Sequence, residues 1–370
     1  MSTTKRALHG LSLVVAMSSA FSAVAKDGRI PIPFSSPVVT PITITQPGSY
    51  VLTRNIGTTG MGAIIDVNIP GPIPGDVDID LNGFILDNSG NGMQNVVQVS
   101  LPPGVVREVK IHDGVINGGA RGIEVRGGGG SVARKVVIHD VQISGTLSDA
   151  IWIENVSNAV VKDCVIVEAG GAAIGVVGAM LPQQAVIEGN VISNSGRGVL
   201  LTSSATLKVV NNAISNITIG RAIDLTGCLS CVVADNTIRS ANGGGQDCVR
   251  LNACSGSRIA DNVVFSCGDH GIRLDSNSHD NLVLRNTVRS VVGVGLLVEG
   301  SRNQIEGNVL NSNGQRGLVL NGNNNVYRGN TARGNTGAGA CGGACSADFC
   351  NGGGGNTSQN DNFLPAAPCN

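Results

Sequence analysis

Residues 267 to 276 read CGDHGIRLDS and gather Asp269, His270, Arg273 and Asp275 within ten positions. Carboxylates, an imidazole and a guanidinium are the groups that proton transfer and the binding of a charged substrate require. Only 14% of the chain is charged, so this density stands out. The segment is therefore either part of an active site or the polar edge of a repeated structure.

The segment is one copy of a repeat of about two dozen residues. In one column of this repeat the same amide residue recurs at Asn190, Asn212, Asn236, Asn262, Asn286, Asn308 and Asn330. A second column has a four-residue pattern: a small residue, an aliphatic residue, a position where any residue type occurs, and another aliphatic residue. The first aliphatic residues of this second column are Ile123, Ile151, Ile174, Val199, Ile223, Val249, Ile272, Leu296 and Leu318. The two columns stay in phase, which indicates a regular stack of similar units.

The alternation of aliphatic and free positions predicts short strands whose β-branched side chains face inward. Each strand is too short to bury a face alone, but stacked copies can pair in parallel about 4.8 Å apart. Asn in the first column is expected to adopt the left-handed conformation at a tight corner and to hydrogen-bond along the stack. The sequence thus predicts an all-β, single-stranded parallel β-helix, a solenoid of about 10 to 11 coils of about 24 residues.

Over about residues 77–335 the repeat resembles the right-handed pectate-lyase-like superfamily. The resemblance rests on NGFILDNSG in the first coil, on IHDGVINGG, and on the GNxI and GIxL columns. It implies that the β-helix is right-handed. The superfamily includes lyases, hydrolases, epimerases and adhesins, so the resemblance is specific for the fold and leaves the activity open.

Residues 1–25 have the pattern of a secretory signal peptide, with a basic start, an apolar run and an Ala-Val-Ala cleavage site that ends at Ala25. The protein is therefore expected to be secreted or periplasmic. Residues 26–76 are rich in proline and are expected to form an N-terminal cap and entry strands. We expect residues 77–335 to form the β-helix and residues 336–370 to form a C-terminal cap rich in Cys and Gly.

The chain has ten cysteines, an even number that favours disulfides in an oxidising compartment. Cys228 and Cys254 occupy the same place on adjacent coils, where Cα atoms about 5 Å apart suit a disulfide. The alternatives are a local link from Cys228 to Cys231 or free thiols. Cys164, in the Asn column, is expected to be a buried free thiol. Two disulfides are expected in the C-terminal cap, among Cys341, Cys345, Cys350 and Cys369.

Outward positions on neighbouring coils are expected about 4.8 Å apart, which gathers ionisable groups on one face. The candidate catalytic residues on this face are Asp224, Asp247, Arg250, His270, Arg273 and Asp275. In a polyuronate lyase, Arg250 or Arg273 would hold the sugar carboxylate and accept the C5 proton, with His270 as proton carrier. The aspartates would orient these groups or hold a Ca²⁺ ion.

Two other interpretations of this face stay open. Two carboxylates about 6.5 to 9.5 Å apart would suit inverting glycoside hydrolysis. Alternating Asp and Arg side chains on adjacent coils could instead form a surface ladder of modest value for stability.

Two segments are similar to motifs of pectin-degrading hydrolases. QDCVRLN resembles their Asp-Asp-Cys segment, and GDHG resembles their Gly-His-Gly segment. The similarity implies that Asp247 is a catalytic carboxylate and that His270 is the histidine beside it. Other positions of the family pattern are altered: Gln246 replaces the companion Asp, Arg221 the first-motif Asp, and Leu297 with Glu299 the Arg-Ile-Lys segment. We therefore do not predict this hydrolase activity.

Trp152 is the only tryptophan and is predicted to face outward, where Gly175 on the next coil would leave space above its ring. With Asp149 and Glu154 beside it, this indole is a candidate substrate-binding residue that stacks on a sugar ring. The alternative is that the loop at residues 126–131 folds over the ring.

Without Lys5 and Arg6, the chain carries 23 basic and 26 acidic residues, a near balance that gives no electrostatic case for nucleic acid. No apolar run predicts a membrane span, and a monomer is expected. No metal site is predicted, because His112 and His139 would stack without a third ligand.

We predict a carbohydrate-active protein that acts on or binds an acidic polysaccharide in a lyase-like manner. The alternative is a non-catalytic extracellular glycan-binding or structural rod.

Overall fold

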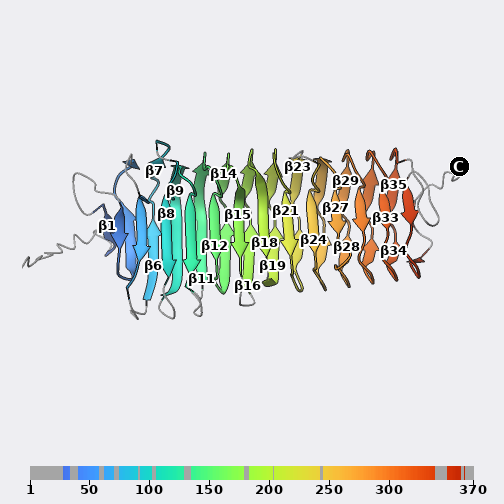
Figure 1. Ribbon diagram of the computed structural model, residues 1–370, viewed down its shortest axis with the longest axis horizontal. Coiled ribbons are helices and arrows are strands. Elements are labelled where there is room, and N and C mark those ends of the chain that lie inside the picture. Colours follow the sequence, from blue (N-terminus) through green and yellow to red (C-terminus); the bar gives the residue numbers. More distant parts are fainter. Residues whose placement is uncertain are drawn as a thin grey trace, which may run out of the picture.

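The computed structural model describes residues 28–33, 41–57, 62–70, 75–90, 92–101, 106–128, 135–178, 183–202, 204–241, 245–337, 348–359 and 362. The predicted signal peptide lies outside these residues. The described chain forms strands and no helix, so none of it is a helix that could cross a membrane. Figure 1 shows a rod in which short strands run across the long axis and follow one another from end to end.

Each coil contributes one strand to each of three parallel ladders. The first ladder consists of β2 (Ile42–Ile44), β5 (Ile65–Asn68), β8 (Val97–Leu101), β10 (Ile123–Gly127), β12 (Ile151–Glu154), β15 (Ala172–Val177), β18 (Arg197–Thr202), β21 (Ile223–Thr226), β24 (Val249–Asn252), β27 (Ile272–Leu274), β30 (Leu296–Val298), β33 (Leu318–Leu320) and β36 (Phe349–Asn351).

The second ladder consists of β1 (Ile30–Ile32), β3 (Gly48–Leu52), β6 (Gly75–Asp80), β9 (Val106–Gly118), β11 (Lys135–Ser144), β13 (Asn158–Lys162), β16 (Gln183–Glu188), β19 (Ser204–Val210), β22 (Val232–Ala234), β25 (Arg258–Ala260), β28 (Leu282–Leu284), β31 (Gln304–Glu306), β34 (Val326–Arg328) and β37 (Thr357–Ser358). The third consists of β4 (Ile56–Gly57), β7 (Ile85–Asn88), the later halves of β9 and β11, β14 (Val165–Val167), β17 (Val191–Ser193), β20 (Ala213–Ser215), β23 (Thr237–Ala241), β26 (Val263–Cys267), β29 (Thr287–Arg289), β32 (Val309–Asn311) and β35 (Thr331–Arg333).

The predicted all-β parallel solenoid is confirmed, and it is right-handed. Ten strands of the first ladder lie within residues 77–335, as the repeat predicted. Parallel pairing also extends beyond both predicted boundaries, because β2 pairs with β5 and β33 pairs with β36. Residues 26–76, expected to hold a cap and entry strands, thus contribute strands to the ladders, and β36 lies within residues 336–370.

The alternation of side chains builds the core as expected. In β24, Val249 and Leu251 are fully buried, whereas Arg250 between them is only partly buried. Successive side chains of a strand point to opposite faces, so aliphatic residues fill the interior and the positions between them face outward. This arrangement leaves the outer faces of the three ladders as the places where chemistry can be displayed.

The Asn column forms a buried hydrogen-bonded ladder between the second and third ladders. The Asn236 side-chain amide donates to Asn262 Oδ1 at 3.0 Å, and the Asn262 amide donates to Asn286 Oδ1 at 2.9 Å. The predicted stacking is confirmed, but the predicted left-handed conformation is wrong for these residues. The residue before each Asn has it instead, as Asp235 and Asp261 show with φ of 57° and 59°. The corner turns one residue earlier, which leaves the Asn side chain pointing into the stack.

The structure corrects one cysteine prediction. Cys228 and Cys254 do stack on adjacent coils, because Leu229 pairs with Ser255, but both are buried free thiols, as is Cys231. Side chains at equivalent positions of a parallel stack point the same way, so their Cβ atoms stay about one coil spacing, 4.8 Å, apart. A disulfide needs Cβ atoms about 3.8 Å apart. The stack thus places the two residues in register without letting them bond.

A disulfide that the repeat did not predict joins Cys248 and Cys267, whose Cα atoms are 5.5 Å apart. It joins the residue before β24 to the end of β26 within a single coil. Cys164 is a buried free thiol, as predicted, and burial raises its pKa to about 12. Cys350 is disulfide-bonded. The other cysteines of the predicted C-terminal cap, Cys341, Cys345 and Cys369, lie outside the described residues.

Candidate functional site

The outer face of the first ladder holds the predicted site residues in the predicted register. Trp152 pairs with Gly175, and Asp224 pairs with Arg250, which in turn pairs with Arg273. These residues lie between β12 and β27, in the middle of the rod (Figure 1). One coil separates each pair, so the column brings together residues that are more than 20 positions apart in the sequence.

The arginines of this column are occupied by carboxylates. Arg250 Nε donates to Asp275 Oδ2 at 3.0 Å, and this hydrogen bond raises the Arg250 pKa. Arg273 Nε lies 3.0 Å from Asp275 Oδ1, and its Nη2 donates to Glu299 at 2.9 Å. A guanidinium held in this way is a poor proton acceptor, so the pairing argues against Arg250 as a base. Asp275 is thereby ion-paired with both arginines.

Asp247 is the most buried ionisable group of the cluster, with 2% of its side chain exposed. Its Oδ2 lies 3.5 Å from Arg221 Nε, whereas its Oδ1 has no hydrogen-bond partner among the described residues. Burial raises the Asp247 pKa, although nearby His270 and Arg273 oppose the shift. A buried carboxyl group with a raised pKa is the kind of group that enzymes use as a general acid.

His270 lies beside this carboxyl group with one ring nitrogen already engaged. Its Nδ1 accepts the backbone N–H of Val294 at 2.9 Å and lies 3.3 Å from Asp269 Oδ1. One ligand atom from each of Asp247, Asp269 and His270 lies within 4.8 Å of the others. Because Nδ1 is engaged by the Val294 backbone, Nε2 is the ring nitrogen of His270 that can exchange a proton with a ligand.

Two of the aspartates expected to orient the arginines or to hold calcium are engaged by arginines. Asp224 Oδ2 accepts a hydrogen bond from Arg221 Nη1 at 3.2 Å, and Asp275 is shared by two arginines. These contacts are ion pairs between a carboxylate and a guanidinium.

His112 and His139 do stack, with ring centroids 4.9 Å apart. The two ring nitrogens of His112 face Asp113 at 2.7 Å and Asp78 at 3.0 Å. Both ring nitrogens of His112 are therefore hydrogen-bonded to carboxylates.

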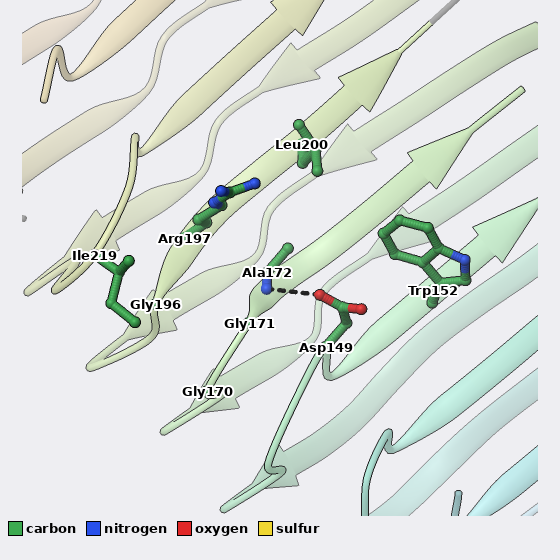
Figure 2. A pocket seen from close by; sticks show the side chains of 9 residues that line it. All are labelled: Asp149, Trp152, Gly170, Gly171, Ala172, Gly196, Arg197, Leu200 and Ile219. Atoms are coloured by element: carbon green, nitrogen blue, oxygen red, sulfur yellow. Dashed lines mark hydrogen bonds between the residues drawn. The ribbon is translucent and has the colours of Figure 1, made fainter.

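A pocket of about 340 Å³ opens on the same face, N-terminal to the charged cluster. Its lining residues come from the coils of β12, β15 and β18 and from Ile219 in the coil of β21, and Figure 2 shows Trp152 at one end, Ile219 at the other and Arg197 between them. Its lining residues are Asp149, Trp152, Gly170, Gly171, Ala172, Gly196, Arg197, Leu200 and Ile219. The glycines have no side chains that would fill the pocket, and the side chains of Leu200 and Ile219 add apolar surface to its lining.

Trp152 is held at the pocket by its neighbours along the rod. Arg121 lies over the indole with its Cζ 4.8 Å from the ring centroid. A Cβ atom at Gly175 would lie 2.5 Å from the indole Cε3, so the ring itself fills the space that the glycine leaves. The predicted open space above the ring is therefore taken up by the ring, which leans toward the next coil. The loop proposed to cover it lies partly outside the described residues.

Asp149 is mainly a positioning residue. Its Oδ1 accepts the backbone N–H of Ala172 at 2.8 Å, and its Oδ2 accepts Arg121 Nε at 3.1 Å (Figure 2 shows the first bond). With both oxygens engaged and 8% of the residue exposed, Asp149 links two coils and holds Arg121 against Trp152. Glu154 is partly exposed and lies 3.5 Å from the indole Nε1.

Arg197 is a pocket residue that the sequence reasoning did not single out. It is exposed, and its guanidinium has no ion pair or hydrogen bond within the described chain. Its stem crosses Gly220, where a Cβ atom would lie 2.6 Å from the Arg197 Cγ. The sequence did contain a signal, because the residue one coil before it in the column is Ala172 and the one after is Arg221. An arginine without a carboxylate at the equivalent position of either neighbouring coil is available to a ligand.

Comparison with solved structures finds the same fold in other proteins. The catalytic unit of a GH87 alpha-1,3-glucanase from Streptomyces thermodiastaticus matches with a TM-score of 0.53 and 16% identity, over 88% of this chain and 63% of that one. The periplasmic alginate epimerase AlgG matches with a TM-score of 0.53 and 13% identity, over 85% and 77%. The Agl-KA catalytic domain matches with a TM-score of 0.50 and 11% identity, over 90% and 59%. At these identities the likeness shows a shared fold.

The chain spans less than two thirds of the length of the glucanase unit. No curated protein matches the sequence. Three overlapping stretches, residues 82–214, 121–288 and 220–363, match the family model of the right-handed beta helix region. Together they cover most of the rod described above, so the chain belongs to the right-handed beta helix family.

Proposed function

We propose that the outer face of the first ladder binds a polysaccharide, and that the pocket between Trp152 and Arg197 takes an acidic sugar of that chain. The observation that carries the proposal is the exposed Arg197 guanidinium, unpaired within the described chain, in one pocket with the only tryptophan. Arginine recognises a carboxylate with two parallel N–H donors. An indole offers an apolar surface for the ring of the same sugar.

The length of the face supports an extended ligand. Trp152 and the Asp247 region are separated by four coils, roughly 19 Å at the usual strand spacing. A face of this length accommodates several sugar units, so a polysaccharide fits better than a single sugar. The shared fold with an alginate epimerase and a glucanase is consistent with a glycan ligand. We further propose that residues 1–25 direct export and that cleavage follows Ala25.

Binding is tested with the full chain, using its single tryptophan as the reporter. Oligogalacturonate or oligoalginate should change the Trp152 fluorescence, whereas a neutral glucan of equal length should bind at least about 10-fold more weakly. Arg197→Gln should remove this preference. Arg302→Gln is the matched control, because Arg302 is exposed and is paired with Asp280 away from the pocket. Equal binding of acidic and neutral glycans by the wild type would contradict the proposal.

A second candidate function is acid–base chemistry on the bound glycan by Asp247 and His270. It is favoured by the buried Asp247 Oδ1 that lacks a hydrogen-bond partner within the described chain. A lyase would produce unsaturated uronates, which absorb in the ultraviolet, from pectate or alginate. Asp247→Asn and His270→Gln should each lower that rate by about 100-fold or more. A wild-type protein that binds the glycan without producing absorbance or reducing ends would leave the non-catalytic binder as the function.

A further inference from the structure

The outer face of the third ladder carries a second pattern that the proposed pocket does not explain. In each strand of this ladder from β23 to β35, two residues face outward and one inward-facing residue separates them. The later positions pair in register from coil to coil as Arg239, Phe265, Arg289, Asn311 and Arg333. The β23, β29 and β35 labels follow the upper edge of the rod in Figure 1, so this column runs along the long axis.

The five described strands of this face carry arginines and no acidic residue. The five strands read TIRSA, VVFSC, TVR, VLN and TAR. The first ladder differs, because Arg250 and Arg273 there meet carboxylates on the next coil. In a chain whose charges nearly balance, an outer face with arginines alone is a local excess of positive charge.

Two of these arginines have donors available to a ligand. Arg239 is exposed, and its guanidinium has no ion pair or hydrogen bond within the described chain. Arg289 is also exposed and lies over the Phe265 ring, with its Cζ 5.0 Å from the ring centroid. A cation–π contact holds the guanidinium above the sheet while its N–H groups at the edge remain open. By contrast, Arg285 and Arg302 at the nearby corner are each paired with an aspartate.

The spacing of the arginines fits a linear ligand. Arg239, Arg289 and Arg333 recur every second coil, roughly 10 Å apart at the usual strand spacing. Thr237, Val263 and Thr287 form an uncharged column beside them. A compact anion would reach one arginine, whereas an extended chain with regularly spaced anionic groups would reach both Arg239 and Arg289.

We propose that this outer face of the third ladder, from β23 to β35, is a second binding surface that takes a linear sulfated or carboxylated polysaccharide. Its arginines bind the anionic groups, and the threonines beside them face the hydroxyl groups of the sugars. The single aromatic ring, Phe265, is covered by Arg289, so the face lacks the stacking surfaces that single-stranded nucleic acids use. The surface is on a different ladder from the pocket and does not depend on it.

The test compares two double variants of the full chain that lose the same charge. Arg239→Gln with Arg289→Gln should weaken the binding of heparin, a sulfated polysaccharide, by about 10-fold or more, and should reduce its dependence on salt. Arg285→Gln with Arg302→Gln is the control, because both arginines are exposed at a corner and already paired. Binding is measured by biolayer interferometry, and circular dichroism confirms that both variants keep the fold.

Three results would overturn the inference. The first is unchanged heparin affinity in the Arg239 and Arg289 double variant. The second is an equal loss in the control, which would indicate a general charge effect. The third is equally tight binding of single-stranded DNA of the same charge. Arg197→Gln separates this surface from the pocket: it should leave heparin binding by the third ladder unchanged, and failure of either site leaves the test of the other intact.

Discussion

Asn262 donates and accepts hydrogen bonds in both directions along the rod. Its side-chain amide donates to Val233 O, Ala260 O and Asn286 Oδ1, and its Oδ1 accepts the backbone N–H of Asn236. Asn262→Ala should lower the free energy of unfolding by at least about 1–3 kcal/mol, since buried polar groups on both neighbouring coils lose partners. Urea denaturation measures the loss.

Asn252→Ala in the same coil is the matched control for this substitution. Asn252 is partly exposed and occupies an outward position of β24. Its replacement should change the free energy of unfolding by no more than about 0.5 kcal/mol. Equal effects of the two substitutions would show that the buried ladder contributes nothing specific.

The raised pKa of Asp247 predicts a dependence of stability on pH. Between the ordinary carboxyl pKa of about 4 and the raised value, the folded protein binds a proton that the unfolded chain has released. The contribution of Asp247 to the free energy of unfolding therefore falls as the pH rises through this interval. Asp247→Asn should become more stable relative to the wild type as the pH rises from about 4 and should level off above the raised pKa. Urea denaturation from acid to neutral pH measures the difference in free energy of unfolding between this variant and the wild type. A difference that stayed constant with pH would contradict the prediction.

Gly175 determines where the Trp152 ring can lie. Gly175→Ala places a methyl group where the indole Cε3 lies only 2.5 Å away, so the ring must move out of its present position. We expect a shifted fluorescence maximum and at least about 10-fold weaker glycan binding, because the apolar surface of the pocket is displaced. Gly57→Ala is the control, because its Cβ atom would meet only Asp87 O at 3.7 Å. An unchanged emission spectrum in Gly175→Ala would refute this account of the ring.

At the scale of the elements, the disulfide between Cys248 and Cys267 ties β24 to β26 beside the charged cluster. The two residues are 19 positions apart, and closing a loop of this size stabilises a protein by about 3 kcal/mol. The double variant Cys248→Ala with Cys267→Ala should lose about that amount in guanidinium denaturation. Because Cys248 follows Asp247, glycan chemistry at Asp247 should weaken as well. A double variant with wild-type stability would mean that the bond does not constrain the coil.

At the scale of the whole molecule, a solenoid is stabilised mainly by contacts between neighbouring coils. Deletion of residues 287–308 removes one complete coil and brings Asn286 into register with Asn330, so the Asn ladder stays continuous. The shortened chain should fold cooperatively, with a rod about 4.8 Å shorter. Deletion of residues 287–297 removes half a coil and should prevent folding beyond β28, because inward and outward residues lose their register. Circular dichroism and small-angle scattering distinguish the two outcomes.

The two glycan surfaces proposed here also belong to the scale of the whole molecule. The pocket lies on the first ladder and the arginine column lies on the third, so one rod presents two separate faces. Each face has its own matched variants. A protein that bound glycans through neither face would be a structural rod, which is the remaining alternative for this sequence.

The sequence alone determined the features that depend on the axis of the rod. The period of the repeat identified the parallel coils, the Asn ladder and the register that stacks Asp224, Arg250 and Arg273. These features follow from one distance, the spacing between paired strands, which is the same for every residue. The tertiary structure decided what depends on the cross-section of a coil, including the bond from Cys248 to Cys267 and the pocket beside Arg197. Corner lengths and side-chain packing set those contacts, and they vary from coil to coil, so the period of the repeat does not contain them.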